Sequence, residues 1–220
     1  MSTPVLAGII FDMDGVLVDS EPFICEAAMR MFAETYGIAV RKEDFIPFVG
    51  AGEDRFIGGV AEKYGIALTM PRDKQRTYAI YLEIIRGRLH PLPGAPDFVR
   101  AARLRGYKLA LATSADRIKM IGNLAEIGIA GEAFDAIVTG DDVQHKKPDP
   151  QIFLLAAERL GLPPAQCLVL EDAPNGIRAA AAAGCRSIGV LSSFSEASLR
   201  EAGASFIARD LAHVPPDALA

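Results

Sequence analysis

The strongest constraint on the fold is an alternation of short apolar segments with segments of helical periodicity in the C-terminal two thirds of the chain. The apolar segments have the length and composition of buried strands and cover residues 107–113, 135–139, 167–171, 187–191 and 205–208. The intervening segments carry apolar residues at helical spacing, as in Ile118, Ile121 and Ala125. Strands this apolar, joined by single helices, predict an α/β fold with a doubly wound parallel sheet covered by helices on both faces.

A long insertion separates the first apolar segment, residues 5–11, from the helix that follows Pro93. The interval of roughly 80 residues is far longer than an ordinary connection between a strand and a helix, so it should contain a folded unit. Its apolar residues recur at helical spacing in residues 24–36, 56–64 and 78–85. We therefore predict two domains, a core formed by residues 1–15 and 93–220 and an all-helical cap formed by residues 16–92.

Composition and charge exclude several classes of function. Hydrophobic residues make up 50% of the chain and charged residues 23%, as in an ordinary globular enzyme. The net charge of −5 argues against a nucleic-acid-binding surface, and no apolar run approaches the roughly 18 residues of a membrane helix. The first residues lack signal-peptide features, and Cys25, Cys167 and Cys185 lack metal or redox spacing. We expect buried free thiols, a cytoplasmic location, and no nucleic-acid or membrane partner. The sequence leaves the oligomeric state open and is compatible with a monomer.

Two acids, Asp12 and Asp14, follow the first strand directly in the sequence FDMDG. Residues i and i+2 of an extended segment point in the same direction, so the two carboxylates should converge. Convergent carboxylates repel each other unless a cation or a proton lies between them. The alternative interpretation of this motif alone is an ordinary turn, in which Asp and Gly are common.

Polar residues also lie at two later positions where a strand or loop leads into a helix. Thr113 and Ser114 end one strand and open the next helix, where hydroxyls and free N–H groups can bind an anion or simply cap the helix. Lys147 precedes a proline, which favours an extended lead-in to a helix that Asp149 can cap and Pro150 can begin. The alternative for Lys147 is a solvated lysine.

A further pair of acids, Glu171 and Asp172, ends the apolar strand CLVLED. Alone, the pair could be acids at the start of a helix. However, the carboxyl ends of parallel strands meet at one edge of a sheet, where open α/β sheets bind their ligands. Acids, anion-binding hydroxyls and a lysine at this edge together predict a site for a metal ion and a phosphate.

The motifs DMDGVLVDSE, KKPDP and EDAPNGIRAAAAAG together resemble those of the haloacid dehalogenase (HAD) superfamily, subfamily I, and the resemblance covers essentially the whole chain. The chain is similar to the branch of β-phosphoglucomutases and phosphoglycolate phosphatases, and FVGAGEDRFIGGVA also resembles HAD-like domains fused into certain plant chloroplast proteins. The resemblance implies a Rossmann-like core with a helical cap. It also implies a Mg²⁺-dependent phosphatase that hydrolyses a small phosphorylated metabolite, such as a sugar phosphate, through an aspartyl-phosphate.

The resemblance assigns roles to individual residues of this sequence. The nucleophile falls on Asp12 and the general acid/base on Asp14. Phosphate binding falls on the Thr113 hydroxyl, on the Ser114 backbone N–H and on Lys147, whose charge also assists catalysis.

The resemblance also implies how Mg²⁺ would be held. Its ligands would be the Asp12 side chain, the Asp14 carbonyl and the Asp172 side chain, with Glu171 as a supporting ligand or partner of a ligand. A receiver-type phospho-switch without turnover uses a similar set of groups, but it has neither the insertion nor a second acid such as Asp14. A haloacid dehalogenase also lacks this second acid, because a halide leaves without a proton.

A sugar-phosphate mutase of the β-phosphoglucomutase type is the alternative within the family. The cap histidine and cap arginine of those mutases fall on Ile24 and Glu53, and an acid at position 53 would repel a second phosphate. Arg55 could supply this cation only if the loop of residues 50–53 has a different conformation from that of the mutases. We therefore expect hydrolysis of a monophosphate, with Glu53 and Arg55 as candidate substrate contacts in the cap.

Overall fold

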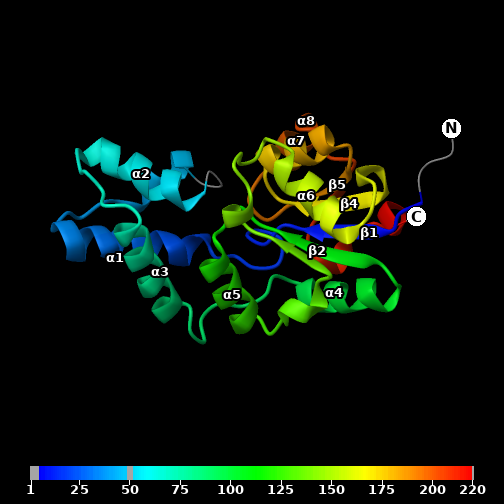
Figure 1. Ribbon diagram of the computed structural model, residues 1–220, viewed down its shortest axis with the longest axis horizontal. Helices are drawn as coiled ribbons and strands as arrows, with labels where there is room; N and C mark the ends of the chain where they lie inside the picture. Colours follow the sequence, from blue (N-terminus) through cyan, green and yellow to red (C-terminus); the bar gives the residue numbers. More distant parts are fainter. Residues whose placement is uncertain (1–4, 49–51, 220) are drawn as a thin grey trace.

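The computed structural model describes residues 5–48 and 52–219, and Figure 1 shows a sheet flanked by helices with a helical lobe at one end. The strands are β1 (Gly8–Phe11), β2 (Lys108–Ala112), β3 (Ala136–Val138), β4 (Cys167–Glu171), β5 (Arg186–Val190) and β6 (Phe206–Ala208). The helices are α1 (Glu21–Tyr36), α2 (Glu53–Tyr64), α3 (Arg72–Ile84), α4 (Ala95–Leu104), α5 (Arg117–Glu126), α6 (Gln151–Leu160), α7 (Pro174–Ala183) and α8 (Glu196–Glu201).

The described strands form one six-stranded sheet in the order β3–β2–β1–β4–β5–β6, and all of its pairs are parallel. Gly8 of β1 lies beside both Lys108 and Cys167, so β1, β2 and β4 reach the same edge of the sheet. The predicted doubly wound α/β fold is confirmed. The first strand is shorter than predicted, because it begins at Gly8 and the exposed Val5 lies outside it.

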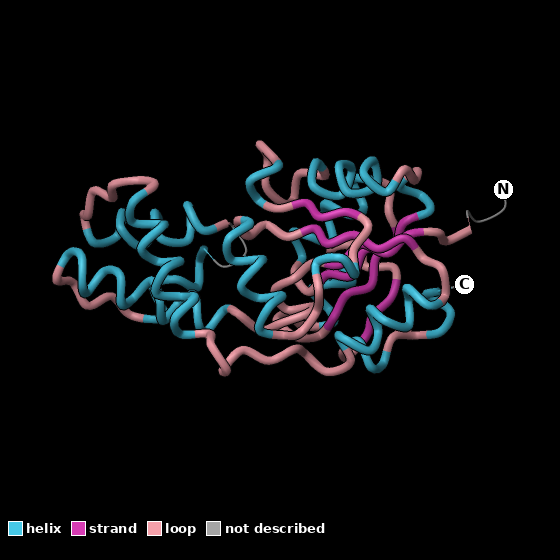
Figure 2. Tube along the Cα trace, turned by 60° about the horizontal axis from the view of Figure 1, so that its bottom comes forward, coloured by secondary structure: helices cyan, strands magenta, loops and turns pink. Residues whose placement is uncertain are grey.

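Helices cover both faces of the sheet, as Figures 1 and 2 show. Helices α4 and α5 lie on one face, and α6, α7 and α8 lie on the other, as right-handed crossovers require when the chain winds first toward β3 and then toward β6. Successive side chains of β1 point to opposite faces. Phe11 accordingly joins the cluster that contains Val99 of α4, whereas Ile10 joins the cluster that contains Phe153 of α6.

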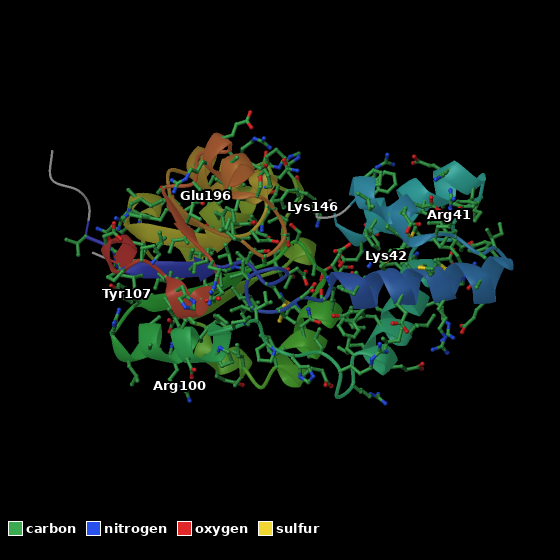
Figure 3. The ribbon with its side chains drawn as sticks, turned by 180° about the vertical axis from the view of Figure 1, so that it is seen from behind. Arg41, Lys42, Arg100, Tyr107, Lys146 and Glu196 are labelled. Atoms are coloured by element: carbon green, nitrogen blue, oxygen red, sulfur yellow. The ribbon has the colours of Figure 1, made fainter. Side chains whose placement is uncertain are left out.

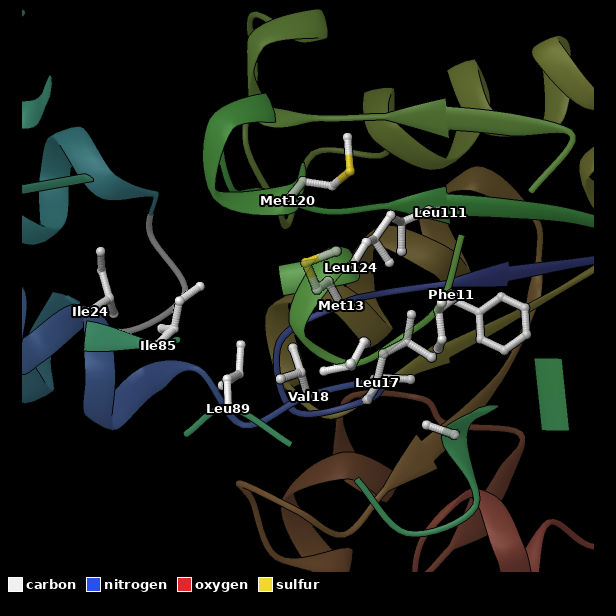
Figure 4. Packing of buried hydrophobic residues seen from close by; sticks show 14 of the residues in the cluster. Phe11, Met13, Leu17, Val18, Ile24, Ile85, Leu89, Leu111, Met120 and Leu124 are labelled. Carbon is white, nitrogen blue, oxygen red and sulfur yellow. The ribbon is translucent and has the colours of Figure 1, made fainter. Parts of the chain in front are cut away.

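The helical lobe consists of α1, α2 and α3, and these helices confirm the three helical stretches predicted in the insertion. Its core is continuous with that of the sheet. Figure 4 shows Phe11 and Met13 at the end of β1 in one cluster with Ile24 and Ile85 of the lobe. The predicted domain limits, 1–15 with 93–220 and 16–92, stay a prediction.

Helix α5 differs from its prediction in the face that it buries. Ile118 and Ile121, which the apolar spacing placed inside together with Ala125, are 45% and 58% exposed. The buried face instead carries two apolar side chains, Met120 and Leu124, together with two polar ones, Lys119 and Asn123. These polar groups have partners close to the sheet edge and the helical lobe, and such partners cannot be seen in the local sequence.

The three cysteines are free and buried, as predicted. Among the described residues, no helix is both long enough and apolar enough to cross a membrane.

Candidate active site

The loop after β1 places two acids at the carboxyl edge of the sheet. Asp12 continues the strand, since its N–H donates to the carbonyl of Leu170 in β4 at 3.0 Å. The chain then turns at Gly15, whose φ of +76° is in the left-handed region. A Cβ at Gly15 would lie 1.9 Å from Asp172 Oδ2. This close approach requires glycine and places the loop after β1 directly against the loop after β4.

Lys147 bridges two acids from different strands. Its Nζ donates to Asp12 Oδ1 at 2.7 Å and to Glu171 Oε1 at 2.5 Å, and all three side chains are buried. Lys147 lies in a turn before α6 and is joined to Pro148 by a cis peptide bond, so it is not on a helical face, as predicted. Helix α6 begins at Gln151, directly after Pro150, and Asp149 caps this end as predicted, because its Oδ1 accepts from the Gln151 N–H at 2.9 Å.

Three buried acids, Asp12, Glu171 and Asp172, form the densest negative cluster in the described part of the chain. Their ligand oxygens all lie within 4.8 Å of one another. Burial, with the charge of Glu171, raises the pKa of Asp12 to about 7 against the opposing effect of Lys147, and burial and the other two acids raise the pKa of Asp172. Hard carboxylate oxygens crowded in this way fit a hard divalent cation such as Mg²⁺, which would offset their repulsion.

Burial opposes the charge of Lys147, but Asp12 and Glu171 more than compensate and raise the pKa of its ammonium. Glu171 also accepts from the Ala173 N–H at 2.9 Å. Gly176, in the first turn of α7, leaves room for this carboxylate, because a Cβ there would lie 1.8 Å from Glu171 Oε1. The positions of Lys147, Asp12 and Glu171 therefore depend on the ends of β1 and β4 and on the first turn of α7.

Thr113 and Ser114 lie at the carboxyl end of β2 and face the same cavity. The Thr113 side chain is buried, and its Oγ1 accepts from the Ala115 N–H at 3.1 Å. The two residues do not open the next helix as predicted, because α5 begins at Arg117 after the capping residue Asp116. The two residues thus line the cavity with the acids instead of opening the helix, and the Thr113 N–H donates to the carbonyl of Val138 at 3.0 Å.

A cavity of about 640 Å³ connects these groups with the helical lobe. Its lining includes Asp12, Lys147 and Thr113 from the sheet edge and Ile24, Phe56 and Glu53 from the lobe. The two candidate cap contacts thus differ. Glu53 lines the cavity, whereas Arg55 points outward, is 52% exposed and pairs with Glu62 at 2.8 Å. Residues 49–51, which precede Gly52 and Glu53 in the chain, lie outside the described residues.

Several residues at the site were not predicted from the sequence. Lys119 and Glu21 both line the cavity, and Ser20 donates to Asp14. Burial raises the pKa of Glu21 to about 7, although the charge of Lys119 opposes this rise. Lys119 was not found because the surrounding sequence RIKMI carries no motif that indicates a site. Lys146, the neighbour of Lys147 in the chain, donates to the carbonyl of Gly140 at 2.6 Å and lies near the junction with the lobe in Figure 3.

Comparisons with known proteins agree with this arrangement. A family model described as haloacid dehalogenase-like hydrolase matches residues 6–184. The protein SUPPRESSOR OF QUENCHING 1, chloroplastic, of Arabidopsis thaliana is 42% identical over 212 residues, which is 95% of this chain but 20% of the plant protein. A phosphorylated carbohydrates phosphatase of Thermotoga maritima is 34% identical over 201 residues, 90% of this chain and 92% of the relative.

Solved structures show the same fold. The crystal structure of CbbY from Rhodobacter sphaeroides in complex with phosphate has a TM-score of 0.86 and 26% identity, and the match covers 98% of this chain and 99% of that chain. The family model spans most of this sequence, and a relative matched over nearly its full length is more than 30% identical. The chain therefore belongs to the haloacid dehalogenase-like hydrolase family.

Proposed function

We propose that this protein is a Mg²⁺-dependent phosphatase that hydrolyses a small phosphorylated metabolite, such as a sugar phosphate, through an aspartyl-phosphate. The observation that carries the proposal is the buried contact of Lys147 with Asp12, beside two further acids and at the wall of a cavity. The similarity to a relative named as a phosphorylated carbohydrates phosphatase supports the substrate class.

Asp12 is the proposed nucleophile. One of its carboxylate oxygens attacks the phosphorus, and the bond between phosphorus and the ester oxygen breaks. A carboxylate and a phosphate dianion repel each other, so the reaction needs positive charge at this point. Lys147 supplies one such charge, because its ammonium already contacts Asp12 at 2.7 Å. Asp12, Glu171 and Asp172 would hold Mg²⁺, with the Asp14 carbonyl as a further ligand, and the bound ion would neutralise charge on the phosphoryl oxygens.

Asp14 is the proposed general acid and base. It gives a proton to the departing alkoxide and then takes a proton from the water that attacks the phosphorus of the aspartyl-phosphate. That second step breaks the bond to Asp12, releases inorganic phosphate and restores both carboxyl groups. Thr113 and Ser114 would hold the phosphoryl oxygens from the side of β2, where they face the cavity.

Residues 16–92 are proposed to act as a cap that covers the substrate and excludes bulk water. Glu53 is the cap residue whose position favours hydrolysis over mutase chemistry. It lines the cavity where a mutase would need a cation for a second phosphate, and Arg55 is turned away toward Glu62. A carboxylate at this position repels a bisphosphate intermediate, so water should be the acceptor of the phosphoryl group.

The test is a screen of phosphorylated metabolites with Mg²⁺, using the wild-type protein, Asp12→Asn and the control Asp97→Asn. Asp97 is an exposed acid on α4, far from the cavity lining. We expect steady phosphate release that a chelator abolishes and Mg²⁺ restores, inhibition by fluoroaluminate, and loss of turnover in Asp12→Asn alone. Full turnover by Asp12→Asn, or release of at most one equivalent of phosphate, would contradict the proposal.

A second assay separates the phosphatase from the mutase. The protein is incubated with Mg²⁺, β-glucose 1-phosphate and a trace of the 1,6-bisphosphate. We expect inorganic phosphate to form faster than glucose 6-phosphate, and the opposite order would identify a mutase.

A further inference from the structure

Lys119 on α5 is a buried cation outside the group of residues assigned above. Its side chain is only 4% exposed, although Lys119 directly follows the exposed Ile118 and lies two residues before the exposed Ile121. Burying an ammonium group costs free energy unless acids nearby compensate for the lost hydration. We therefore expect acidic side chains close to the Lys119 ammonium.

Two acids from different parts of the chain compensate for this charge. Lys119 Nζ donates to Asp14 Oδ2 at 2.9 Å, and it lies 3.4 Å from Glu53 Oε1. Asp14 follows β1, whereas Glu53 begins α2 in the helical lobe. A single ammonium group thus connects the proposed acid/base of the sheet edge with the acid that faces the cavity from the lobe.

The contacts of Asp14 show what Lys119 adds. The second oxygen of Asp14 accepts a hydrogen bond from Ser20, so both carboxylate oxygens have a donor. Asp14 is more exposed than the other site acids, with 29% of its side chain accessible, and it lies in a loop. Without Lys119 only the Ser20 hydroxyl would restrain this carboxylate, and a loop side chain would sample several rotamers.

The contact of Lys119 with Glu53 extends from Asp14 to the wall of the cavity. Its side chain is 9% exposed and lines the cavity, and among the described residues its Oε2 has no hydrogen-bond partner. The Lys119 ammonium also lies 5.9 Å from the ring centroid of Tyr81 in α3, whose hydroxyl donates to Asn123 of α5. Lobe and core are therefore in contact around Lys119 on two sides.

We propose that Lys119 is a positioning residue that holds the Asp14 carboxylate in its catalytic position and links that position to the lobe through Glu53. The proposal rests on the proposed function, because it requires Asp14 to act as general acid. Lys119 is not a catalytic residue in this scheme, since it acts on the substrate only through Asp14. When the lobe lies over the sheet edge, Glu53 and Asp14 share one ammonium group, and the acid is held where an ester oxygen leaves.

The test compares two substrates that differ in their need for an acid. One is the alkyl phosphate that is hydrolysed fastest in the screen above, and the other is p-nitrophenyl phosphate, whose leaving group departs as a stabilised anion without a proton. The measured quantity is kcat/KM, which includes only the steps up to phosphoryl transfer to Asp12. A positioned acid contributes about 10²–10⁴-fold to such a step. We expect Lys119→Met to lower the ratio of the alkyl to the aryl kcat/KM by about tenfold or more.

Three further variants separate positioning from a general structural effect. Lys119→Arg keeps the charge and should recover part of the ratio. Glu53→Gln should lower the ratio less than Lys119→Met, and the double variant Lys119→Met/Glu53→Gln should not be worse than Lys119→Met alone. Lys74→Met is the matched control. Lys74 in α3 bridges Asp54 and Asp116 at 2.9 and 2.8 Å across the same interface, so its removal should leave the ratio unchanged.

Each outcome decides between the alternatives. If Lys119→Met lowers kcat/KM equally for both substrates, Lys119 has only a structural role and the proposal is wrong. If Glu53→Gln leaves the ratio of the two kcat/KM values unchanged, Glu53 does not link Asp14 to the lobe. If Lys119→Met does not fold, as judged by circular dichroism, the double variant carries the test, because it leaves no buried charge unpaired between positions 53 and 119. A wild-type protein that hydrolyses neither substrate would refute the proposed function itself.

Discussion

Gly176 gives the most direct way to test the geometry of the acid cluster without touching an acid. A Cβ at this position would lie 1.8 Å from Glu171 Oε1 and 1.9 Å from its Cδ, so Gly176→Ala must displace the carboxylate. The backbone at Gly176 is helical and not in the left-handed region, so alanine causes no strain of its own. The effect of the substitution is therefore an effect on Glu171.

The size of that effect follows from the two contacts that Glu171 would lose. They are the bond from Lys147 at 2.5 Å and the bond from the Ala173 N–H at 2.9 Å. A hydrogen bond to a charged group contributes about 1.5–3 kcal/mol, so the loss of both costs about 3–6 kcal/mol. Alanine in a helix returns at most about 1 kcal/mol. We expect the free energy of unfolding to fall by about 2–5 kcal/mol.

The metal requirement should change together with the stability. Disturbing the partners around a metal site typically lowers metal affinity by about 10–100-fold. We therefore expect the Mg²⁺ concentration for half-maximal phosphatase activity to rise by about that factor. The assays are urea denaturation in chelator and a Mg²⁺ titration of activity, both with wild type and Gly176→Ala.

Gly58→Ala is the matched control. Gly58 lies inside α2 with no atom within 4 Å of its added Cβ, so this variant measures the helix effect alone and should gain about 1 kcal/mol. If Gly176→Ala instead behaved like Gly58→Ala, with wild-type stability or better and an unchanged Mg²⁺ requirement, the position of Glu171 described here would be wrong.

Further predictions concern metal binding, packing and acid stability. Mg²⁺ at about 100 times its dissociation constant should stabilise the fold by about 2.7 kcal/mol, seen as a higher melting temperature; no shift would argue against a metal site. Gly59→Ala should destabilise by about 1–3 kcal/mol, because its Cβ would meet the Phe48 ring at 2.3 Å; a stable variant would contradict that packing. Although burial opposes the shift, bonds from Thr139 and Arg159 lower the pKa of Asp142 to about 2. Asp142 should therefore stabilise the fold by about 1 kcal/mol above pH ~4, and this contribution should disappear as the pH falls toward 2. Urea denaturation of Asp142→Asn and wild type at pH 6 and pH 2.5 checks this, and an equal difference at both values would refute it.

The edge of the sheet that carries the candidate site could be predicted from the sequence because two general rules place it. Buried parallel strands end at a common edge, and polar residues directly after such strands must lie there. Asp12, Thr113 and Glu171 satisfy both rules, and the register of β1, β2 and β4 brings them to one edge. Lys147 was found by its place before proline, which predicted that it would lie off the helical face, as it does.

The buried face of α5 could not be predicted by the same means. Helical periodicity finds the side that packs against apolar neighbours, and it selected Ile118 and Ile121. Lys119 is buried because Asp14, which follows β1, and Glu53 of α2 lie against it, and both acids are distant from it in the sequence. Pairings of this kind depend on the tertiary structure, and the places where local sequence patterns fail are often functional sites.

The order of residues after β1 explains why the proposed acid/base, Asp14, and not the proposed nucleophile, Asp12, is the acid in contact with the lobe. Asp12 is held by the sheet, because its N–H bonds to Leu170. Asp14 lies two residues further along, where it pairs with Val18, and Val18 in turn pairs with Pro91 on the segment that returns from the lobe. A displacement of the lobe would therefore reach Asp14 before Asp12, whose backbone is bonded to β4. In the proposed mechanism the nucleophile keeps one position against the phosphate, whereas the acid is needed only when the cavity is covered. In the proposed mechanism, Asp12 is thus held rigidly by the sheet for nucleophilic attack, whereas Asp14 is connected to the lobe that covers the cavity.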